Sequence, residues 1–400
     1  MTPNAKEIAF MLLSDTCLPM PDYGGGSIVN LMASLIRGRG GEAACPNLYL
    51  LPPEDIQGYT NVLLLVIDGL GANWLAERSP TGILSRHQIG TITSVFPTTT
   101  AAAITTFLTG DAPQQHGITG WFTYFRELGC VMSVLPGHPR YGGVGYRQAG
   151  VDLAALLGHG CLASRIRTRA FFLTPASITH SDFNLAHLGP AQARPFKDLR
   201  DMFRQAAHIL RADTGPKYLY LYWPGLDSRG HEAGMASPLV ARHLGAIEQA
   251  LTDFMVNSAG TDTLVLVTAD HGLIDTRPED RIDLASHPEL AACLSLPLCG
   301  EPRAALCYLR PRRVQDFEDY CQQVLSGHAL LRPSHELVRL GLFGQGESHP
   351  RLEERVGDYT LLLTGRSVIR DRLPSEKDLV QIGVHGGLSK TELCVPLCRL

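Results

Sequence analysis

The sequence predicts an α/β fold: a mainly parallel central sheet flanked by helices, with a small α+β insert. Three continuous aliphatic or aromatic runs, at 61–67, 218–223 and 263–268, have the length and composition of strands buried on both faces. Helix-like segments at 197–212 and 237–257 precede the second and third runs. Strands that alternate with helices are typical of a parallel sheet, and an aspartate follows each of the three runs.

The composition favours a large globular chain. Four hundred residues with 44% hydrophobic content are sufficient for one main α/β domain with a smaller insert. A net charge of −4 and the lack of a basic run indicate neither a nucleic-acid polymer nor an anionic membrane as partner. The apolar patch at 8–13 is too short for a membrane span or a signal sequence, so we expect a cytoplasmic protein. The ten scattered cysteines are expected to be reduced, and the oligomeric state stays open.

The change of pattern after the third strand predicts the domain organisation. We expect residues 1–272 and 381–400 to form the main catalytic domain and residues 273–380 to form the α+β insert or cap. Within the insert, 304–310 and 359–363 are typical of strands and 314–325 of an amphipathic helix, separated by proline-rich joints. The last residues, 392–400, are expected to add a final strand to the main sheet.

Carboxylates and imidazoles follow the predicted strands. Because the carboxyl ends of parallel strands meet at one edge of a sheet, the three strand-end aspartates are expected to converge there. Taken singly, each aspartate is as typical of a helix cap as of a site. The set is Asp68, Asp227 and Asp270, joined by His231, His271 and His385. Three carboxylates and three imidazoles match two zinc ions, with manganese as the alternative, and are too rich in nitrogen for magnesium or calcium alone.

The threonine-rich stretch 93–110 predicts a strand, a turn and the start of a helix. Thr100 falls near the helix N-terminus, where free N–H groups can hold a phosphate beside an oxygen nucleophile. The alternative is that Thr98, Thr99 and Thr100 only cap the helix and fill space. Two metal ions close together can activate a hydroxyl and clamp an in-line phosphoryl displacement. The predicted product is a phosphothreonine, which water then hydrolyses.

Four motifs together resemble the alkaline phosphatase superfamily, and within it the nucleotide pyrophosphatase/phosphodiesterase branch. They are Asp68-Gly69, Asp227-x-x-Gly-His231, Asp270-His271-Gly272 and His385-Gly386, and they match that branch in order and local spacing. The resemblance implies an alkaline-phosphatase-like fold and hydrolysis of a phosphodiester or pyrophosphate bond. It also implies a small phosphate ester as substrate, with nucleotides among the candidates.

The resemblance further implies how two metal ions are held and which residue attacks. One ion would take Asp68, Asp270, His271 and the Thr100 hydroxyl, and the other would take Asp227, His231 and His385. In family members the nucleophile stands ten residues before the glycine that ends its helix, here Gly110, which gives Thr100 and leaves Thr99 as second choice. The chain departs from the family in one respect here, because Val95 precedes the Phe96-Pro97 pair where the nucleophile is usual.

A second departure concerns the phosphate-holding asparagine of this branch, whose position is taken by Trp121. Its function as a donor would pass to helix N–H groups or to Thr119, Arg126 or Arg229. The aromatic residues Trp121, Phe122, Tyr124 and Phe125 are predicted to offer a stacking or cation-binding wall for the leaving group, with Trp121 and Tyr124 as the substrate contacts. The alternative is that they belong to the core.

Other functions with the same machinery stay open at this point. A phosphomonoesterase and a phosphonate hydrolase would use the same two-metal site. A protein that binds a phosphate ester without turnover is the third alternative.

Overall fold

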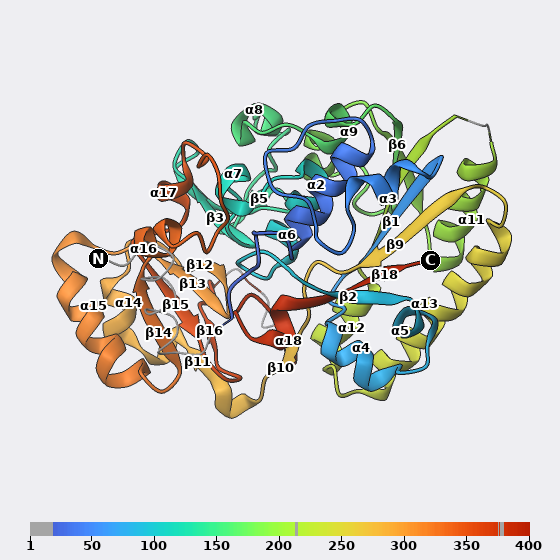
Figure 1. The fold of residues 1–400 in the computed structure, drawn as a ribbon. Helices are drawn as coiled ribbons and strands as arrows, with labels where there is room; N and C mark the ends of the chain where they lie inside the picture. The colour runs from blue at the N-terminus through green and yellow to red at the C-terminus, as the bar shows by residue number, and fades with distance from the viewer. Residues whose placement is uncertain (1–18, 213–214, 375, 377–379) are drawn as a thin grey trace, which may run out of the picture.

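The computed structural model describes residues 19–212, 215–374, 376 and 380–400, so the apolar patch at 8–13 lies outside the described residues. Its centre is a seven-stranded sheet with the order β2-β18-β9-β1-β8-β6-β7 (Figure 1). The strands are β1 (Asn61–Ile67), β2 (Gln88–Thr93), β6 (Arg169–Pro175), β7 (Gln192–Phe196), β8 (Lys217–Trp223), β9 (Thr263–Thr268) and β18 (Cys394–Arg399). The three predicted strands are the adjacent parallel strands β9, β1 and β8, and every residue of β1 is buried. The predicted final strand is β18, which runs antiparallel to both β2 and β9.

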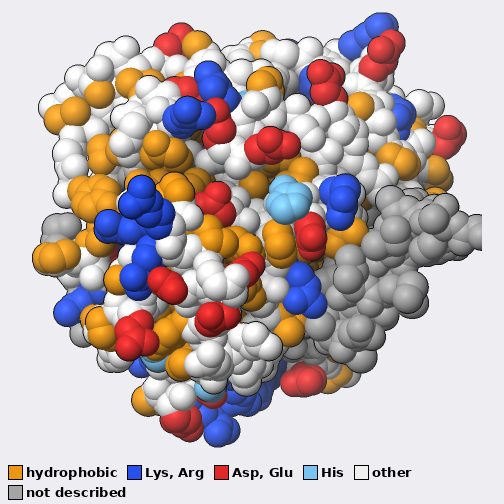
Figure 2. Space-filling view, turned by 90° about the vertical axis from the view of Figure 1, so that its left-hand side faces the viewer, with side chains coloured by type: hydrophobic (Ala, Val, Ile, Leu, Met, Phe, Trp, Pro, Cys, Tyr) orange, Lys and Arg blue, Asp and Glu red, His pale blue; other side chains and the backbone are white. Residues whose placement is uncertain are grey.

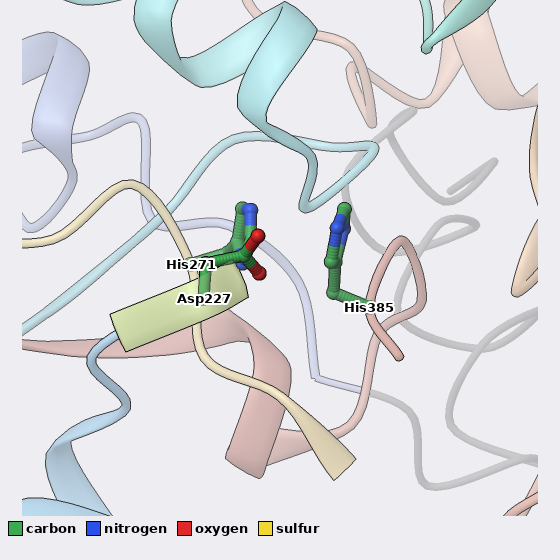
Figure 3. Close-up of side chains that lie close together, drawn as sticks. All are labelled: Asp227, His271 and His385. Carbon is green, nitrogen blue, oxygen red and sulfur yellow. The ribbon is translucent and has the colours of Figure 1, made fainter. Parts of the chain in front are cut away.

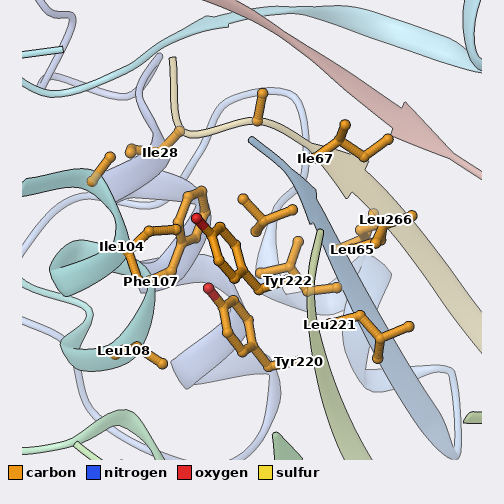
Figure 4. Close-up of a cluster of buried hydrophobic side chains, with 14 of the residues drawn as sticks. Ile28, Leu65, Ile67, Ile104, Phe107, Leu108, Tyr220, Leu221, Tyr222 and Leu266 are labelled. Carbon is orange, nitrogen blue, oxygen red and sulfur yellow. The ribbon is translucent and has the colours of Figure 1, made fainter. Parts of the chain in front are cut away.

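Helices cover both faces of this first sheet. They are α2 (Ile28–Gly38), α3 (Pro53–Gln57), α4 (Ala72–Arg78), α5 (Ile83–Arg86), α6 (Thr100–Thr109), α7 (Pro113–His116), α8 (Leu153–Leu157), α9 (Leu162–Arg165), α10 (Asp182–Ala186), α11 (Leu199–Arg211), α12 (Gly225–Ala233), α13 (Pro238–Asn257) and α18 (Lys390–Leu393). Helices α2 and α6 lie on one side of the sheet, and α4, α5, α12 and α13 on the other (Figure 1). Figure 4 shows Ile104, Phe107 and Leu108 of α6 against Tyr220 and Tyr222 of β8. Helix α6 ends at Gly110, whose φ of 84° favours glycine.

A second seven-stranded sheet has the order β14-β15-β13-β12-β3-β4-β5. Its strands are β3 (Phe122–Phe125), β4 (Cys130–Ser133), β5 (His138–Pro139), β12 (Cys299–Glu301), β13 (Ala304–Cys307), β14 (Ala329–Pro333) and β15 (Tyr359–Leu363). The helices around it are α14 (Pro288–Cys293), α15 (Val314–Tyr320), α16 (Ser334–Arg339) and α17 (Leu352–Arg355). Three 3₁₀ turns lie at Pro278–Asp280, Leu284–Ser286 and Pro311–Arg313. Two short strand pairs complete this part: β10 (Ile274–Asp275) with β17 (Gly383–Val384), and β11 (Arg281–Asp283) with β16 (Val368–Arg370).

The predicted insert differs from this arrangement in its details. The strand expected at 304–310 ends at Cys307, and the helix expected at 314–325 divides into α15 and a π-helical segment, Cys321–Leu325. The second sheet also takes three strands from 122–139, because Gly300 of β12 pairs with Phe122 of β3. The division at 273–380 therefore stays a prediction, since one sheet draws strands from both sides of that boundary.

The outer face of the second sheet and its helices carries acidic and basic side chains interspersed over its described part (Figure 2). This pattern agrees with the small net charge. Among the described residues, no helix has both the length and the apolar character needed to cross a membrane.

Candidate metal centre

The first ligand group, Asp68, Asp270 and His271, follows two neighbouring strands of the first sheet. Asp68 comes directly after β1, and Asp270 and His271 come just after β9. The parallel register pairs Val66 with Thr268, so the two strands end side by side. The His271 Nε2 atom lies 3.5 Å from Asp68 Oδ1 and 3.4 Å from Asp270 Oδ2. All three side chains are buried, which follows from their position at the centre of the sheet.

The second ligand group, Asp227, His231 and His385, comes from a helix and a loop. Asp227 lies in the first turn of α12, and His231 one turn later places its Nε2 atom 3.2 Å from Asp227 Oδ2. His385 directly follows β17, and its ring stacks on that of His271 with 3.8 Å between the centroids. Figure 3 shows Asp227, His271 and His385 gathered from α12, the loop after β9 and the loop after β17. The structure therefore brings all six predicted ligands into one cluster.

Each carboxylate of the cluster has one oxygen engaged by the protein and one buried without a hydrogen-bond partner among the described residues. Asp270 Oδ1 accepts the N–H groups of Gly69 and His271, and Asp68 Oδ2 accepts the Tyr222 hydroxyl. The unpartnered atoms are Asp68 Oδ1, Asp227 Oδ1 and Asp270 Oδ2. Buried acceptors without a donor are costly, and a bound cation would satisfy all three.

Each imidazole is oriented in the same way. The Nδ1 atoms lie near backbone carbonyl oxygens: His231 at 2.7 Å from Gly383, His271 at 3.2 Å from Gly272 and His385 at 3.0 Å from Thr98. A ring that donates from Nδ1 has its Nε2 lone pair free, which is the usual arrangement of a metal-bound histidine. The donor set therefore fits divalent metal ions that accept both carboxylate and imidazole.

Ligand atoms within 4.8 Å of one another form two candidate metal-binding groups: Asp68, Asp270 and His271, and Asp227, His271 and His385. His271 belongs to both, whereas the resemblance assigns it to the first ion alone. His231 contacts Asp227 but lies outside the second set of closely spaced atoms. The predicted split between two ions therefore stays a prediction, with His271 as the point of difference.

The three carboxylates of the cluster lie close together in a buried space, where their negative charges repel one another. Burial and the neighbouring carboxylates of Asp270 and Asp227 raise the pKa of Asp68. Burial likewise raises the pKa of Asp270. Burial also opposes ionisation of Asp227, but the adjacent His231 holds the pKa of that carboxyl at about 2. Burial lowers the pKa of His385, which favours the neutral imidazole that binds metal. A cation would relieve the repulsion among the three carboxylates.

Thr100 is the first residue of α6, and its Oγ1 atom lies 3.1 Å from His271 Nε2. Thr99 is the N-cap, but its hydroxyl donates to Glu301 rather than facing the cluster. The structure thus brings Thr100, and not Thr99, to the candidate ligands.

A cavity of about 420 Å³ opens beside Thr100. Asp68, Thr100 and Asp227 line it, and so does Trp121, one of the two residues predicted to form an aromatic wall. The remaining wall is mainly apolar, with Ile104, Leu108, Leu135, Pro136, Ile178, Phe183, Tyr220 and Tyr222 among its residues. The cavity therefore offers space for a largely apolar group next to the candidate nucleophile.

The other predicted substrate contacts lie elsewhere. Tyr124 is not among the residues that line the cavity, because β3 carries it into the second sheet, where its ring packs 5.3 Å from that of Tyr308. The Thr119 hydroxyl donates to the Arg355 carbonyl, Arg126 pairs with Glu354, and Arg229 donates to the Gly225 carbonyl. None of these three candidate donors lines the cavity.

The comparison with protein families decides the identity. The family model for type I phosphodiesterase / nucleotide pyrophosphatase matches residues 62–385, which include every residue of the cluster. The chain belongs to this family. As a type I phosphodiesterase/nucleotide pyrophosphatase family member, it is a hydrolase, and its two candidate metal-binding groups agree with the two-metal chemistry of that family.

Solved structures place this phosphodiesterase family member in the alkaline-phosphatase-like fold. Murine ectonucleotide pyrophosphatase/phosphodiesterase 5, solved alone and as an inactive form in complex with AMP, superposes with a TM-score of 0.64 at 16% sequence identity. The match covers 84% of this chain and 87% of the murine one. The human form gives the same TM-score at 14% identity, again over 84% and 87% of the two chains. No curated protein sequence matches the chain significantly.

Several contacts that hold the candidate site together gave no signal in the sequence. The Thr98 hydroxyl donates to the Gly387 carbonyl and accepts the Gly386 N–H. Glu392 accepts the Gly387 N–H at 2.8 Å and forms a buried ion pair with Arg303 at 2.9 Å. These contacts join segments far apart in sequence, so local patterns such as strand periodicity or motif spacing do not reveal them.

Proposed function

We propose that this chain hydrolyses a phosphodiester or pyrophosphate bond in a small, nucleotide-like phosphate ester through a phosphothreonine intermediate at Thr100. The observation that carries the proposal is the 3.1 Å distance between Thr100 Oγ1 and His271 Nε2. This hydroxyl stands at the start of α6, beside three buried carboxylates. Each of these carboxylates has one oxygen atom without a hydrogen-bond partner among the described residues. Family membership supports the same reaction class.

The metal assignment in this proposal follows the donor set. Asp68, Asp270, His271 and the Thr100 hydroxyl would hold one ion, and the second ligand group the other. Mixed carboxylate and imidazole ligands favour zinc, with manganese as the alternative. When bound, two such ions would make the threonine hydroxyl and a water more acidic and would stabilise charge that develops on the phosphate oxygens.

The residues of the chain would act as follows. The Thr100 hydroxyl gives up its proton to solvent as its oxygen attacks phosphorus, the bond from phosphorus to the leaving oxygen breaks, and the leaving group departs with the electron pair of that bond. Water then attacks the phosphothreonine, and the Thr100 oxygen leaves and regains its proton. The first N–H groups of α6 have no partner within the helix, so they would hold a non-bridging phosphate oxygen. They take the place of the amide that Trp121 cannot supply.

The substrate is proposed to carry its ester group in the cavity beside Thr100. The mainly apolar wall, with Trp121, suits an uncharged aromatic or heterocyclic group. The AMP complex of the murine neighbour supports a nucleotide-like substrate.

A cytoplasmic location is also proposed, and fractionation of cells that express the protein would test it.

The test is a comparison of three substrates with zinc or manganese supplied. We expect the nitrophenyl ester of thymidine monophosphate to turn over faster than nitrophenyl phosphate or phosphonoacetate. Preference for the second or third would identify a phosphomonoesterase or a phosphonate hydrolase with the same machinery. Thr100→Ala should abolish turnover, while Thr99→Ala should retain it. If no substrate turns over and Thr100→Ala leaves ligand binding unchanged, the chain is a binding protein and the proposal is wrong.

A further inference from the structure

Glu301 reaches from the second sheet to Thr99, the residue before the candidate nucleophile. It is the last residue of β12 and is 6% exposed. Its side chain packs against Gly386, where an added Cβ would lie 2.4 Å from Glu301 Cβ, and the φ of 115° at Gly386 also favours glycine. The Glu301 carboxylate thus lies beside the loop that follows His385. No function described above uses it.

One oxygen of Glu301 holds two segments of the site. Glu301 Oε1 accepts the Thr99 hydroxyl and also the Trp121 N–H, the latter at 2.6 Å. Thr99 directly precedes Thr100, and Trp121 forms part of the cavity wall. A buried carboxylate from a distant strand therefore fixes the residue before the nucleophile and the residue that replaces the phosphate-holding asparagine.

The Thr99 hydroxyl is in an unusual orientation for an N-cap. Thr99 has the extended backbone of an N-cap residue, with φ of −137° and ψ of 147°, yet its side chain makes no hydrogen bond to the N–H groups of α6. An N-cap threonine normally accepts such an N–H group. Because this hydroxyl donates to Glu301, the N–H groups at the start of α6 are not used by the cap.

We propose that Glu301 is a positioning residue that holds the Thr99 hydroxyl away from the N-terminus of α6, so that the helix N–H groups stay available for the substrate phosphate. The same carboxylate fixes Trp121 against the cavity. The inference rests on the proposed function, because it concerns the phosphate site next to Thr100. It assigns to the second sheet a direct part in arranging a site whose candidate nucleophile begins helix α6, on the first sheet.

The key experiment removes the carboxylate and then removes the group that it restrains. In Glu301→Ala, the Thr99 hydroxyl is free to cap α6 and to compete with phosphate for the N–H groups. We expect kcat/KM for the diester to fall by roughly 10- to 100-fold, with a rise in KM, because small misplacements at a reacting centre have effects of this size. In the double variant Thr99→Val with Glu301→Ala, no hydroxyl can cap the helix, so a large part of the loss should be recovered.

Three further variants separate positioning from general stability. Glu301→Gln keeps an acceptor oxygen for both donors and should retain most of the activity. Thr99→Val alone should have a small effect, because the helix N–H groups remain uncapped. Glu318→Ala removes another carboxylate of the same part of the chain, one that accepts the Tyr359 hydroxyl, and should leave kcat/KM unchanged. Bound metal and thermal unfolding are measured for each variant.

A second readout does not depend on turnover. Binding of orthovanadate to the metal-loaded full chain reports the phosphate site directly, and its affinity should fall in Glu301→Ala and recover in the double variant. A double variant no better than Glu301→Ala in both readouts, or a Glu301→Ala protein equal to the wild type, overturns the inference while the proposed function stands. Absence of diester turnover in the wild type, with the vanadate pattern intact, overturns the proposed function and leaves the inference in place.

Discussion

The two ligand groups lie next to each other but are built in different ways. The first, Asp68, Asp270 and His271, follows two central strands whose register is fixed by the sheet. The second, Asp227, His231 and His385, stands on a short helix and a loop, and His385 depends on contacts with Thr98 and with the following loop. The comparison shows that one group is fixed by the first sheet, whereas the other also depends on residues that belong to the second.

The second ligand group depends on the second sheet through Arg303 and Glu392. Arg303 lies in the turn between β12 and β13, and its ion pair with Glu392 is almost completely buried, at 1% and 0% side-chain exposure. Glu392 in turn accepts the N–H of Gly387, two residues after His385. The second ligand group is therefore expected to be the more easily disturbed of the two, and the following variants test that difference.

The largest effect is expected from loss of a carboxylate in the first ligand group. Asp270→Ala removes a fully buried candidate ligand and should lower kcat/KM by more than about 1000-fold, because a metal ion supplies several kcal/mol of transition-state stabilisation. Steady-state kinetics and metal analysis measure the result. Asp253→Ala, on the exposed side of α13, is the control, and a similar loss in that variant would show that the effect is not local.

Substitutions in the second ligand group should mainly lower the number of metal ions bound per chain. Asp227→Ala or His385→Ala should leave close to one metal ion per chain, with kcat/KM lowered by roughly 100-fold, because the first group keeps its ligands. Elemental analysis of purified protein gives the count. Retention of two ions in both variants would contradict the predicted split, and loss of both ions would show that His271 links the two groups too tightly to separate them.

Breaking the ion pair tests whether the second sheet supports only one group. Arg303→Met leaves Glu392 buried without its partner, so the free energy of unfolding should fall by about 3–5 kcal/mol. Urea unfolding measures this loss, and metal titration should show weaker binding of the second ion alone. If the binding of both ions weakened equally, the distinction between the two ligand groups would be wrong.

The smallest effect concerns pH and Glu301 in the metal-free protein. Burial raises the pKa of Glu301 from 4.5 to about 7. Since the pKa is higher in the folded state, the stability from the protonated carboxyl is fully present below about pH 4.5 and is lost as pH rises through about 7. The loss is at most about 3.5 kcal/mol, at roughly 1.4 kcal/mol per pKa unit. Unfolding at pH 4.5 and pH 8 should show a larger loss of stability in the wild type than in Glu301→Gln, where the other buried carboxyls with raised pKa values remain. A wild type with the same pH dependence as this variant would be evidence against a raised pKa.

The sequence alone predicted the parts of the molecule that local patterns determine. The aliphatic runs gave the three central strands, and the aspartates that follow them gave a common edge where the ligands meet. The helix start left Thr98, Thr99 and Thr100 open, and the family's spacing to Gly110 selected Thr100, whose hydroxyl lies beside the cluster in the structure. The motifs and their resemblance to a family led to a hydrolase assignment that the family model confirms.

Those local patterns could not predict contacts between strands and side chains that lie far apart in the sequence. Nothing local in 122–139 indicates that these residues join a sheet with strands from 299–363, and this pairing decides why Tyr124 packs on Tyr308 instead of lining the cavity. Glu301 and Arg303 are two charged residues among many in the sequence. Their importance becomes visible only when the fold places them beside residues about 200 and 90 positions away along the chain.

The pairing of Gly300 with Phe122 has a consequence for any attempt to shorten the chain. A protein shortened by deletion of 273–380 would lose β12 and would leave β3 as an open edge, a form prone to pair with other molecules. It would also lose Glu301 and Arg303 in the same step. The segment 273–380 is thus not a removable accessory. If the proposed function holds, substrate range is more safely altered at the cavity wall around Trp121 than by exchange of whole segments.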